Sequence, residues 1–127
     1  MRKLITFMVS AVVLMSFHAK RINTGDIINA LKQADATAVA NYFDSFVDVK
    51  LPNKDEVKNM SKTQASITLR DFYSEQSIKG FELTSQREMN GTGYLTGKLT
   101  SGKHSYNITI MIKTKGNDAT IVSIRIS

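Results

Sequence analysis

The fold of this chain is decided by its C-terminal stretch, GYLTGKLTSGKHSYNITIMIKTKGNDATIVSIRIS, residues 93–127. Apolar and polar residues alternate along it, which predicts three strands, over residues 94–100, 105–113 and 119–126. One face of these strands is apolar, with the inward set Tyr106, Ile108, Ile110, Ile112, Val122, Ile124 and Ile126. Turns at 100–103 and 115–118 carry Gly and Asn, which accept the positive φ of tight hairpins. An antiparallel meander with one buried face is therefore expected.

The residues before this meander predict helices and two further strands. Residues 26–34 and 35–42 carry helical stripes, and Asp35 is placed to cap the second helix through the amides of Thr37 or Ala38. A strand over 45–51 ends at Pro52, and Asn90-Gly91 predicts a hairpin after a strand over 81–88.

A longer helix is predicted over residues 55–75. Asp55 and Glu56 would lie at the positive end of its dipole. Its expected inner stripe is Val57, Met60, Gln64, Ile67 and Phe72. Helices gathered on one side of a mostly antiparallel sheet make an α+β domain.

Composition limits the chemistry that is available. A length of 127 residues suits one domain. With no cysteine there is no disulfide, thiolate metal site or cysteine nucleophile, and two histidines are too few for a histidine-built metal centre. No cofactor or metal is expected.

The sequence does not predict nucleic-acid binding. A row of lysines at helical spacing is interrupted by acids and lacks interleaved aromatic residues; the row is Lys50, Lys54, Lys58 and Lys62.

The N-terminus predicts a secretory signal peptide over residues 1–19. Arg2 and Lys3 precede an apolar run over residues 4–17, and Ala19 suits the last position before cleavage. The alternative is a transmembrane anchor, although a run of fourteen residues is short against the roughly 20 that span a bilayer. A single domain over 20–127, exported to the periplasm or beyond and without an anchor, is expected. Its net charge falls from +6 to +4 because the leader carries two cations.

Several segments resemble a known family: FDSFVDVKLP, LRDFYSE, GYLTGKL, SYNITIMIK and IVSIRIS. The chain from about Thr24 to Ser127 is similar to a small exported family of the Bacteroidetes type, of unknown function. That family belongs to the nuclear transport factor 2-like, or cystatin-like, superfamily. The resemblance implies an α+β roll, in which a curved antiparallel sheet wraps a long helix, commonly dimeric through the outer sheet face. It implies no specific function.

Function is predicted as binding or association without catalysis, with a small ligand, a second copy or an envelope protein as partner. The alternative is an acid–base enzyme acting on a small apolar substrate, since superfamily members such as ketosteroid isomerase and scytalone dehydratase place Asp, His and Tyr inside the cone. No convincing pair is found, and no catalytic residue is assigned, among the candidates Tyr42, Asp44, Asp48, Asp71, Tyr73, Glu82, Tyr94, His104 and Tyr106.

Two surfaces are predicted. A ligand pocket would be lined by Phe43, Phe46, Phe72, Tyr73, Phe81, Tyr94 and Tyr106, with Arg87 meeting an acidic group. The alternative is that the aromatic residues are ordinary core and that Arg87 lies on the surface past a bulge. An interface on the outer sheet face would contain Thr109, Met111, Ile121, Ser123 and Arg125, beside Asn107.

Overall fold

The computed structural model describes residues 24–127 except 103 and 116–117. The predicted leader therefore lies outside the described residues. The elements in chain order are α2 (Thr24–Lys32), α3 (Ala36–Ala40), β1 (Phe43–Lys50), β2 (Val57–Ser61), α4 (Lys62–Gln76), β3 (Gly80–Met89), β4 (Thr92–Thr100), β5 (Ser105–Lys115) and β6 (Asp118–Ile126). None of these helices is long and apolar enough to cross a membrane.

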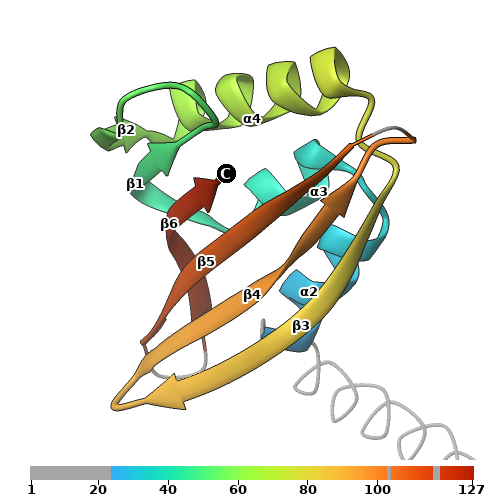
Figure 1. The fold of residues 1–127 in the computed structure, drawn as a ribbon. Coiled ribbons are helices and arrows are strands. Elements are labelled where there is room, and N and C mark those ends of the chain that lie inside the picture. The colour runs from blue at the N-terminus through green and yellow to red at the C-terminus, as the bar shows by residue number, and fades with distance from the viewer. Residues whose placement is uncertain (1–23, 103, 116–117) are drawn as a thin grey trace, which may run out of the picture.

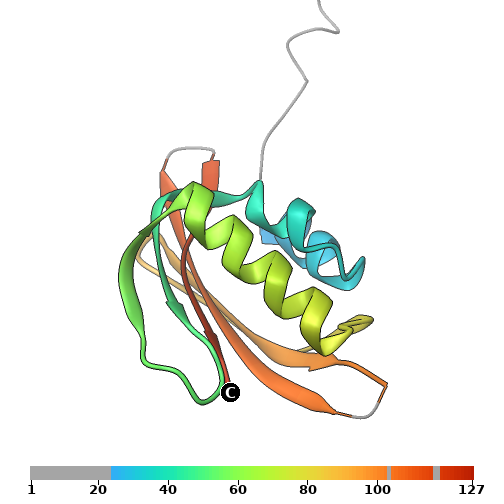
Figure 2. The ribbon, with the colours of Figure 1, turned by 90° about the horizontal axis from the view of Figure 1, so that it is seen from above.

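The strands form one six-stranded sheet in the order β2-β1-β6-β5-β4-β3. Neighbouring strands are antiparallel except β1 and β6, which are parallel. Figures 1 and 2 show that the sheet curves and that α2, α3 and α4 all lie on its concave side. The predicted α+β roll is confirmed, with helices on one face of a curved sheet.

The core lies between the helices and the inner face of the sheet. Leu95, Ile110 and Ile124 form a cross-strand row that is at most 1% exposed. Ile108, Ile112 and Ile126 are equally buried on the neighbouring rows. These burial values confirm the alternation predicted for residues 105–113. The physical cause is that apolar side chains are removed from water only on this face.

The helical elbow at the start of the domain forms as predicted. The Asp35 carboxylate accepts hydrogen bonds from the amides of Thr37 and Ala38, at 3.0 and 3.3 Å, and caps α3. Asn90 and Gly91 both have positive φ, as the predicted hairpin requires.

The prediction for residues 55–61 was wrong. Val57–Ser61 is an edge strand paired with β1, and α4 begins only at Lys62. Asp55 and Glu56 resembled a first helical turn, but the N-cap is Ser61, whose hydroxyl accepts from the amide of Gln64. Pairing with β1 outweighs the local helical pattern, and this pairing cannot be seen in the sequence alone.

The inner stripe predicted for α4 is also corrected. Val57 and Met60 belong to β2, and Gln64 and Ile67 are exposed. The buried side of α4 consists of Ala65, Leu69, Phe72 and Tyr73. The four lysines that seemed to form a helical row lie instead on β1, the loop after it, β2 and α4.

Two bulges shift which residues face the core. On β3, Leu83 pairs with Gly97 but Ser85 pairs with Thr96, so Thr84 is an extra residue. On β6, Met111 of β5 faces Ser123 but Ile112 faces Ile121, so Val122 is extra. Each bulge reverses the in–out alternation of the residues beyond it.

Gly97 lies under the ring of Phe81. A Cβ there would stand 2.5 and 2.7 Å from two atoms of that ring and would meet the Glu82 carbonyl oxygen. We expect Gly97→Ala to lower the free energy of unfolding by about 1–3 kcal/mol through overpacking, measured by urea denaturation.

Gly93→Ala is the matched control on the same strand. Its Cβ would meet nothing closer than the Ile112 Cβ at 3.7 Å. We expect it to be neutral or stabilising by up to about 1 kcal/mol. Equal destabilisation by both substitutions would show that the Phe81 contact is not the cause.

Candidate functional site

Three segments distant in sequence meet at one end of the roll. They are the loop after β1, the C-terminal turn of α4, and the β4–β5 hairpin with the first residues of β5. Figure 2 shows the loop and the hairpin at the end of the sheet where the chain terminates. We call this region the rim.

The rim contains two adjoining hollows that share Glu75 and Gln76. The first, the proline hollow, has a volume of about 420 Å³ and is lined by Leu51, Pro52, Asn53, Lys54, Phe72, Glu75, Gln76 and Tyr106. The second, the histidine hollow, has a volume of about 360 Å³ and is lined by Glu75, Gln76, Ser77, Lys79, Ser101, Gly102 and His104.

Tyr106 stands where the two hollows adjoin. Its hydroxyl donates to the Gln76 Oε1 at 2.6 Å, and its ring meets Phe72 edge to face with centroids 5.3 Å apart. The His104 ring lies 6.5 Å from the Tyr106 ring. The rim thus combines an aromatic pair with a hydrogen bond that fixes the orientation of both side chains.

The walls of the histidine hollow are held by backbone contacts. The Ser101 amide and hydroxyl both donate to the His104 carbonyl oxygen, at 2.9 and 3.2 Å. The Lys79 amide donates to the Thr100 carbonyl at 2.7 Å. The Ser101 bonds lie within the hairpin, and the Lys79 bond ties the hairpin to the segment that follows α4.

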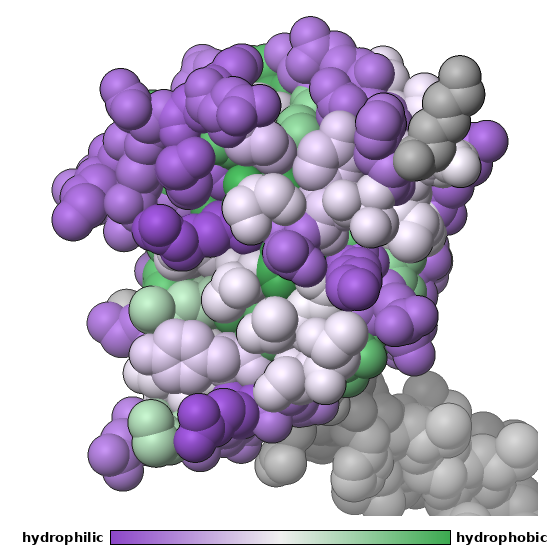
Figure 3. Space-filling model, in the orientation of Figure 1, coloured by the Kyte–Doolittle hydropathy of each residue, from purple (hydrophilic) through white to green (hydrophobic). Residues whose placement is uncertain are grey.

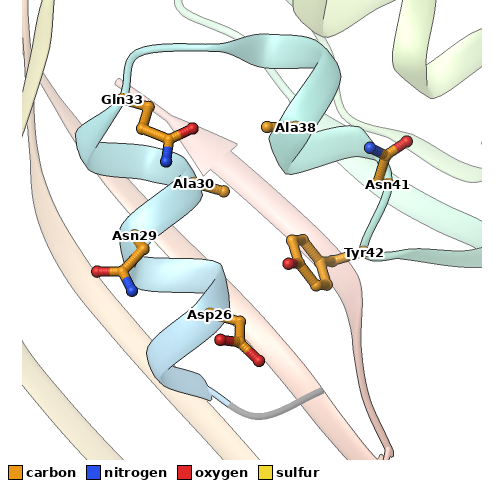
Figure 4. Close-up of a pocket in the computed structure, with 7 residues that line it drawn as sticks. All are labelled: Asp26, Asn29, Ala30, Gln33, Ala38, Asn41 and Tyr42. Carbon is orange, nitrogen blue, oxygen red and sulfur yellow. The ribbon is translucent and has the colours of Figure 1, made fainter. Parts of the chain in front are cut away.

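A third hollow lies between α2 and the end of α3, with a volume of about 280 Å³. Figure 4 shows Asp26 and Asn29 on α2, and Gln33 directly after it, across from Asn41 and Tyr42. Ala30 and Ala38 complete the lining. It offers amide groups that both donate and accept hydrogen bonds.

The structure separates the eight residues of the predicted pocket. Phe72 and Tyr106 meet at the rim, and Phe81 shares the inner-face row of Tyr106 through Leu99. Phe43 and Tyr73 are core residues. Phe46, Arg87 and Tyr94 were predicted on the wrong face of the sheet. Phe46 is 59% exposed on the outer side of β1, opposite to buried Val47 and Val49.

Arg87 and Tyr94 lie on the outer face for one reason. Beyond the Thr84 bulge Arg87 pairs with Tyr94, whose other neighbour is the outer-face residue Met111. Arg87 is exposed and cannot meet a ligand inside the roll. Uninterrupted alternation from Phe81 predicted the wrong face, and the alternative, that Arg87 lies on the surface past a bulge, is confirmed.

The structure shows on which face each residue of the predicted interface lies, and it corrects one of them. Thr109, Met111, Ser123 and Arg125 lie on the outer face, in two adjacent cross-strand rows. Ile121 is fully buried, because the Val122 bulge turns it inward toward Ile112. Arg125 also forms an ion pair with Glu56 at 3.2 Å.

The acid–base candidates do not form a catalytic pair among the described residues. The Asp44 and Asp48 carboxylates accept from the backbone amides of Ser45 and Asn59, both at 2.8 Å. Asp71 and Glu82 are exposed. Within the same residues, no group of three acids or histidines could hold a metal ion.

Tyr73 is the described phenol whose surroundings are most unusual. It is 6% exposed, and its hydroxyl has no hydrogen-bond partner among the described residues. Burial, and to a lesser extent the Asp35 carboxylate, raise the pKa of Tyr73 well above its ordinary value. The neutral phenol is therefore strongly favoured.

Sequence reasoning missed most of the rim. Leu51, Pro52, Lys54 and Lys79 were not predicted as site residues, and His104, which was considered only as an acid–base candidate, is exposed between β4 and β5. These residues meet because a loop, a helix end and a hairpin lie close together in the fold. No periodic pattern in the sequence predicts that arrangement. The signals that were available are the position of Pro52 at a strand end and the single histidine outside the leader.

This arrangement of helices on one face of a curved sheet is that of the nuclear transport factor 2-like proteins. A family model described as a domain of unknown function, DUF4783, matches residues 24–127, and the chain belongs to that family. No curated protein matches the chain.

Solved structures agree with this assignment. A DUF4783 family protein from Bacteroides ovatus has a TM-score of 0.73 at 18% identity, covering 84% of this chain and 96% of that one. One from Bacteroides uniformis has a TM-score of 0.74 at 22% identity, covering 82% and 94%. A nuclear transport factor 2-like protein of unknown function from Pseudomonas putida has a TM-score of 0.60 at 10% identity, covering 81% and 79%. These likenesses show the fold.

We expect Tyr73→Phe to leave stability at pH 7 unchanged or to raise it by about 1 kcal/mol, because it removes an unpaired buried hydroxyl. In the wild type, stability should fall as pH rises above about 10, where the unfolded tyrosine ionises but the folded one does not. Tyr73→Phe should reduce this alkaline loss. Urea unfolding at pH 7 and pH 10.5 measures both effects, and destabilisation of the variant at pH 7 would mean that the hydroxyl is paired.

Proposed function

We propose that this chain is an exported, non-catalytic association domain that pairs with a second copy through the outer face of its sheet. The observation that carries the proposal is the exposed phenylalanine on that face. Phe46 is 59% exposed on the outer side of β1, although Phe is among the residues most often buried.

The outer face around Phe46 has the composition of an interface. We call the set Phe46, Tyr94, Thr96, Thr109, Met111 and Ser123 the outer patch; its members other than Phe46 are partly buried. Figure 3 shows the middle of this face as weakly polar, between strongly hydrophilic borders. Aromatic residues and Met at the centre with charges at the border are typical of association surfaces.

Nothing among the described residues covers this face, since α2, α3 and α4 pack on the opposite side (Figure 2). Asp48, Arg87, Lys98 and the Arg125–Glu56 pair stand around the patch. A two-fold pairing would bury the patch and leave these charges at its border, where exposed ion pairs set register more than affinity.

The packed interior also favours association over catalysis. The inner face carries large side chains that are 0–1% exposed, and the hollows described above lie outside that layer. A cone-type acid–base enzyme, the alternative, needs a carboxylate facing a phenol in a cavity open to substrate. Tyr73 and Asp35 come nearest, yet the Tyr73 hydroxyl is buried and Asp35 caps α3.

We expect the wild-type domain to sediment as a dimer at tens of micromolar. Phe46→Glu with Met111→Glu should give a folded monomer, because each substitution places a charge in the patch that pairing would bury. Ile67→Glu, at a 38% exposed apolar site on α4, is the matched control and should stay dimeric. A wild-type monomer, or a dimer that survives the double substitution, would overturn the proposal.

Export rests on the leader predicted over residues 1–19. We expect the protein recovered from the cell envelope to have an intact mass that corresponds to a chain starting at Lys20. A chain that keeps Arg2 and Lys3 and stays with the membrane pellet would favour the anchor instead.

A further inference from the structure

One row of side chains crosses the outer face of the sheet from β3 to β1. Its members are Arg87 on β3, Tyr94 on β4, Met111 on β5, Ser123 on β6 and Asp48 on β1. We call it the charged row. A guanidinium stands at one end of the charged row and a carboxylate at the other, and the uncharged Met111 lies in the middle.

The two charges of this row cannot meet within one chain. Arg87 and Asp48 are four strand spacings apart, roughly 19 Å. In the part of the chain that the structure describes, Arg87 is exposed and forms no ion pair. The Asp48 Oδ1 accepts from the Asn59 amide at 2.8 Å, which leaves the other carboxylate oxygen able to accept. Each charge is therefore available to a second molecule.

The two most exposed large apolar side chains of the described residues lie next to these charges. Phe46 is 59% exposed and Met89 is 58% exposed. Met89 follows Arg87 by two residues on the outer face of β3, and Phe46 precedes Asp48 by two residues on β1. Because β3 and β1 run in opposite directions, both steps lead toward the same edge of the face. Each end of the charged row thus has one charge and one apolar side chain.

Resting on the pairing proposed above, we infer that the second copy is related by a two-fold axis that runs along β5, between the facing sheets. Such an axis reverses the order of the strands, so that β3 of one copy lies over β1 of the other. Arg87 of each copy then meets Asp48 of the other, and Met89 meets Phe46, a favourable contact between sulfur and an aromatic ring. Met111 faces its own copy near the axis.

The charges favour this axis over one that runs across the strands. An axis across the strands keeps their order and places Arg87 against Arg87 and Asp48 against Asp48, which is repulsive. The axis along β5 brings one pair of like charges together, at Lys113. Lys113 is exposed, and its long side chain can turn its ammonium into solvent.

A charge swap tests the inferred axis, with the dissociation constant of the dimer measured by sedimentation equilibrium on the processed chain. Arg87→Glu and Asp48→Lys should each weaken the dimer about tenfold, because each turns two attractive contacts into repulsive ones. The double variant restores both attractions and should return to within about threefold of the wild type. Asp48→Asn keeps an acceptor for the Asn59 amide and should weaken the dimer about threefold, which separates the charge from any effect on folding.

Lys113→Glu is the matched control, because it reverses an exposed charge on the same face. With the axis along β5 it exchanges one pair of like charges for another. We expect the dissociation constant to change by less than about twofold.

Cross-linking gives a second readout, since the chain has no cysteine of its own. A short bismaleimide should join Met111→Cys to its own copy near the axis. It should not join Arg87→Cys to itself, because the two copies of β3 would lie roughly 19 Å apart along the interface.

The inferred axis is wrong if Arg87→Glu leaves the dimer unchanged, if the double variant stays as weak as the single ones, or if Arg87→Cys cross-links to itself. The proposed function fails by a different result, a wild-type chain that sediments as a monomer. A dimer that Phe46→Glu with Met111→Glu disrupts but Arg87→Glu does not would keep the pairing and overturn the axis.

Discussion

Everything in this domain depends on burying one face of a twisted sheet. The row formed by Val49, Ile124, Ile110 and Leu95 crosses four neighbouring strands and is at most 5% exposed. Full burial of one such side chain is worth roughly 1.5–3 kcal/mol, so the row alone outweighs any single polar contact in the molecule. The helices lie where they do because this face needs a cover, and the opposite face is left for other uses.

The same alternation that makes the sheet predictable also limits the prediction. Periodicity correctly identified the buried isoleucines of β5, because no irregularity interrupts that strand. It failed for Arg87 and Ile121, which both lie beyond an inserted residue. A bulge is set by how two strands pair. The apolar pattern of one strand does not show where its register with the partner strand will shift. One extra residue on β3 was enough to move a proposed ligand contact to the surface, and one on β6 moved a proposed surface contact into the core.

Elements that depend on tertiary contacts were not predicted from the sequence either. A helix was predicted over Val57–Ser61 because acids precede it and the lysines have helical spacing. These residues form a strand because they pair with β1. The rim is less predictable still, since it is assembled from a loop, a helix end and a hairpin. Phe72 and Tyr106 were predicted as site residues from their type alone, whereas the lysines that give the rim its charge carried no signal. Loop positions follow from the packed scaffold and not from local pattern.

The position of β6 has a consequence for how the molecule acquires its structure. The last strand of the chain is central in the sheet, between β1 and β5, and its parallel partner β1 comes from the first half of the domain. Until the final residues are available, β1 has only the five-residue β2 beside it, and the core row cannot close. Such non-local pairing slows folding, because the entropy cost of closing a long loop precedes the gain from the contact. Without β6, strands β1 and β5 would lose the neighbour that they share, and β1 with β2 would no longer be joined to the rest of the sheet.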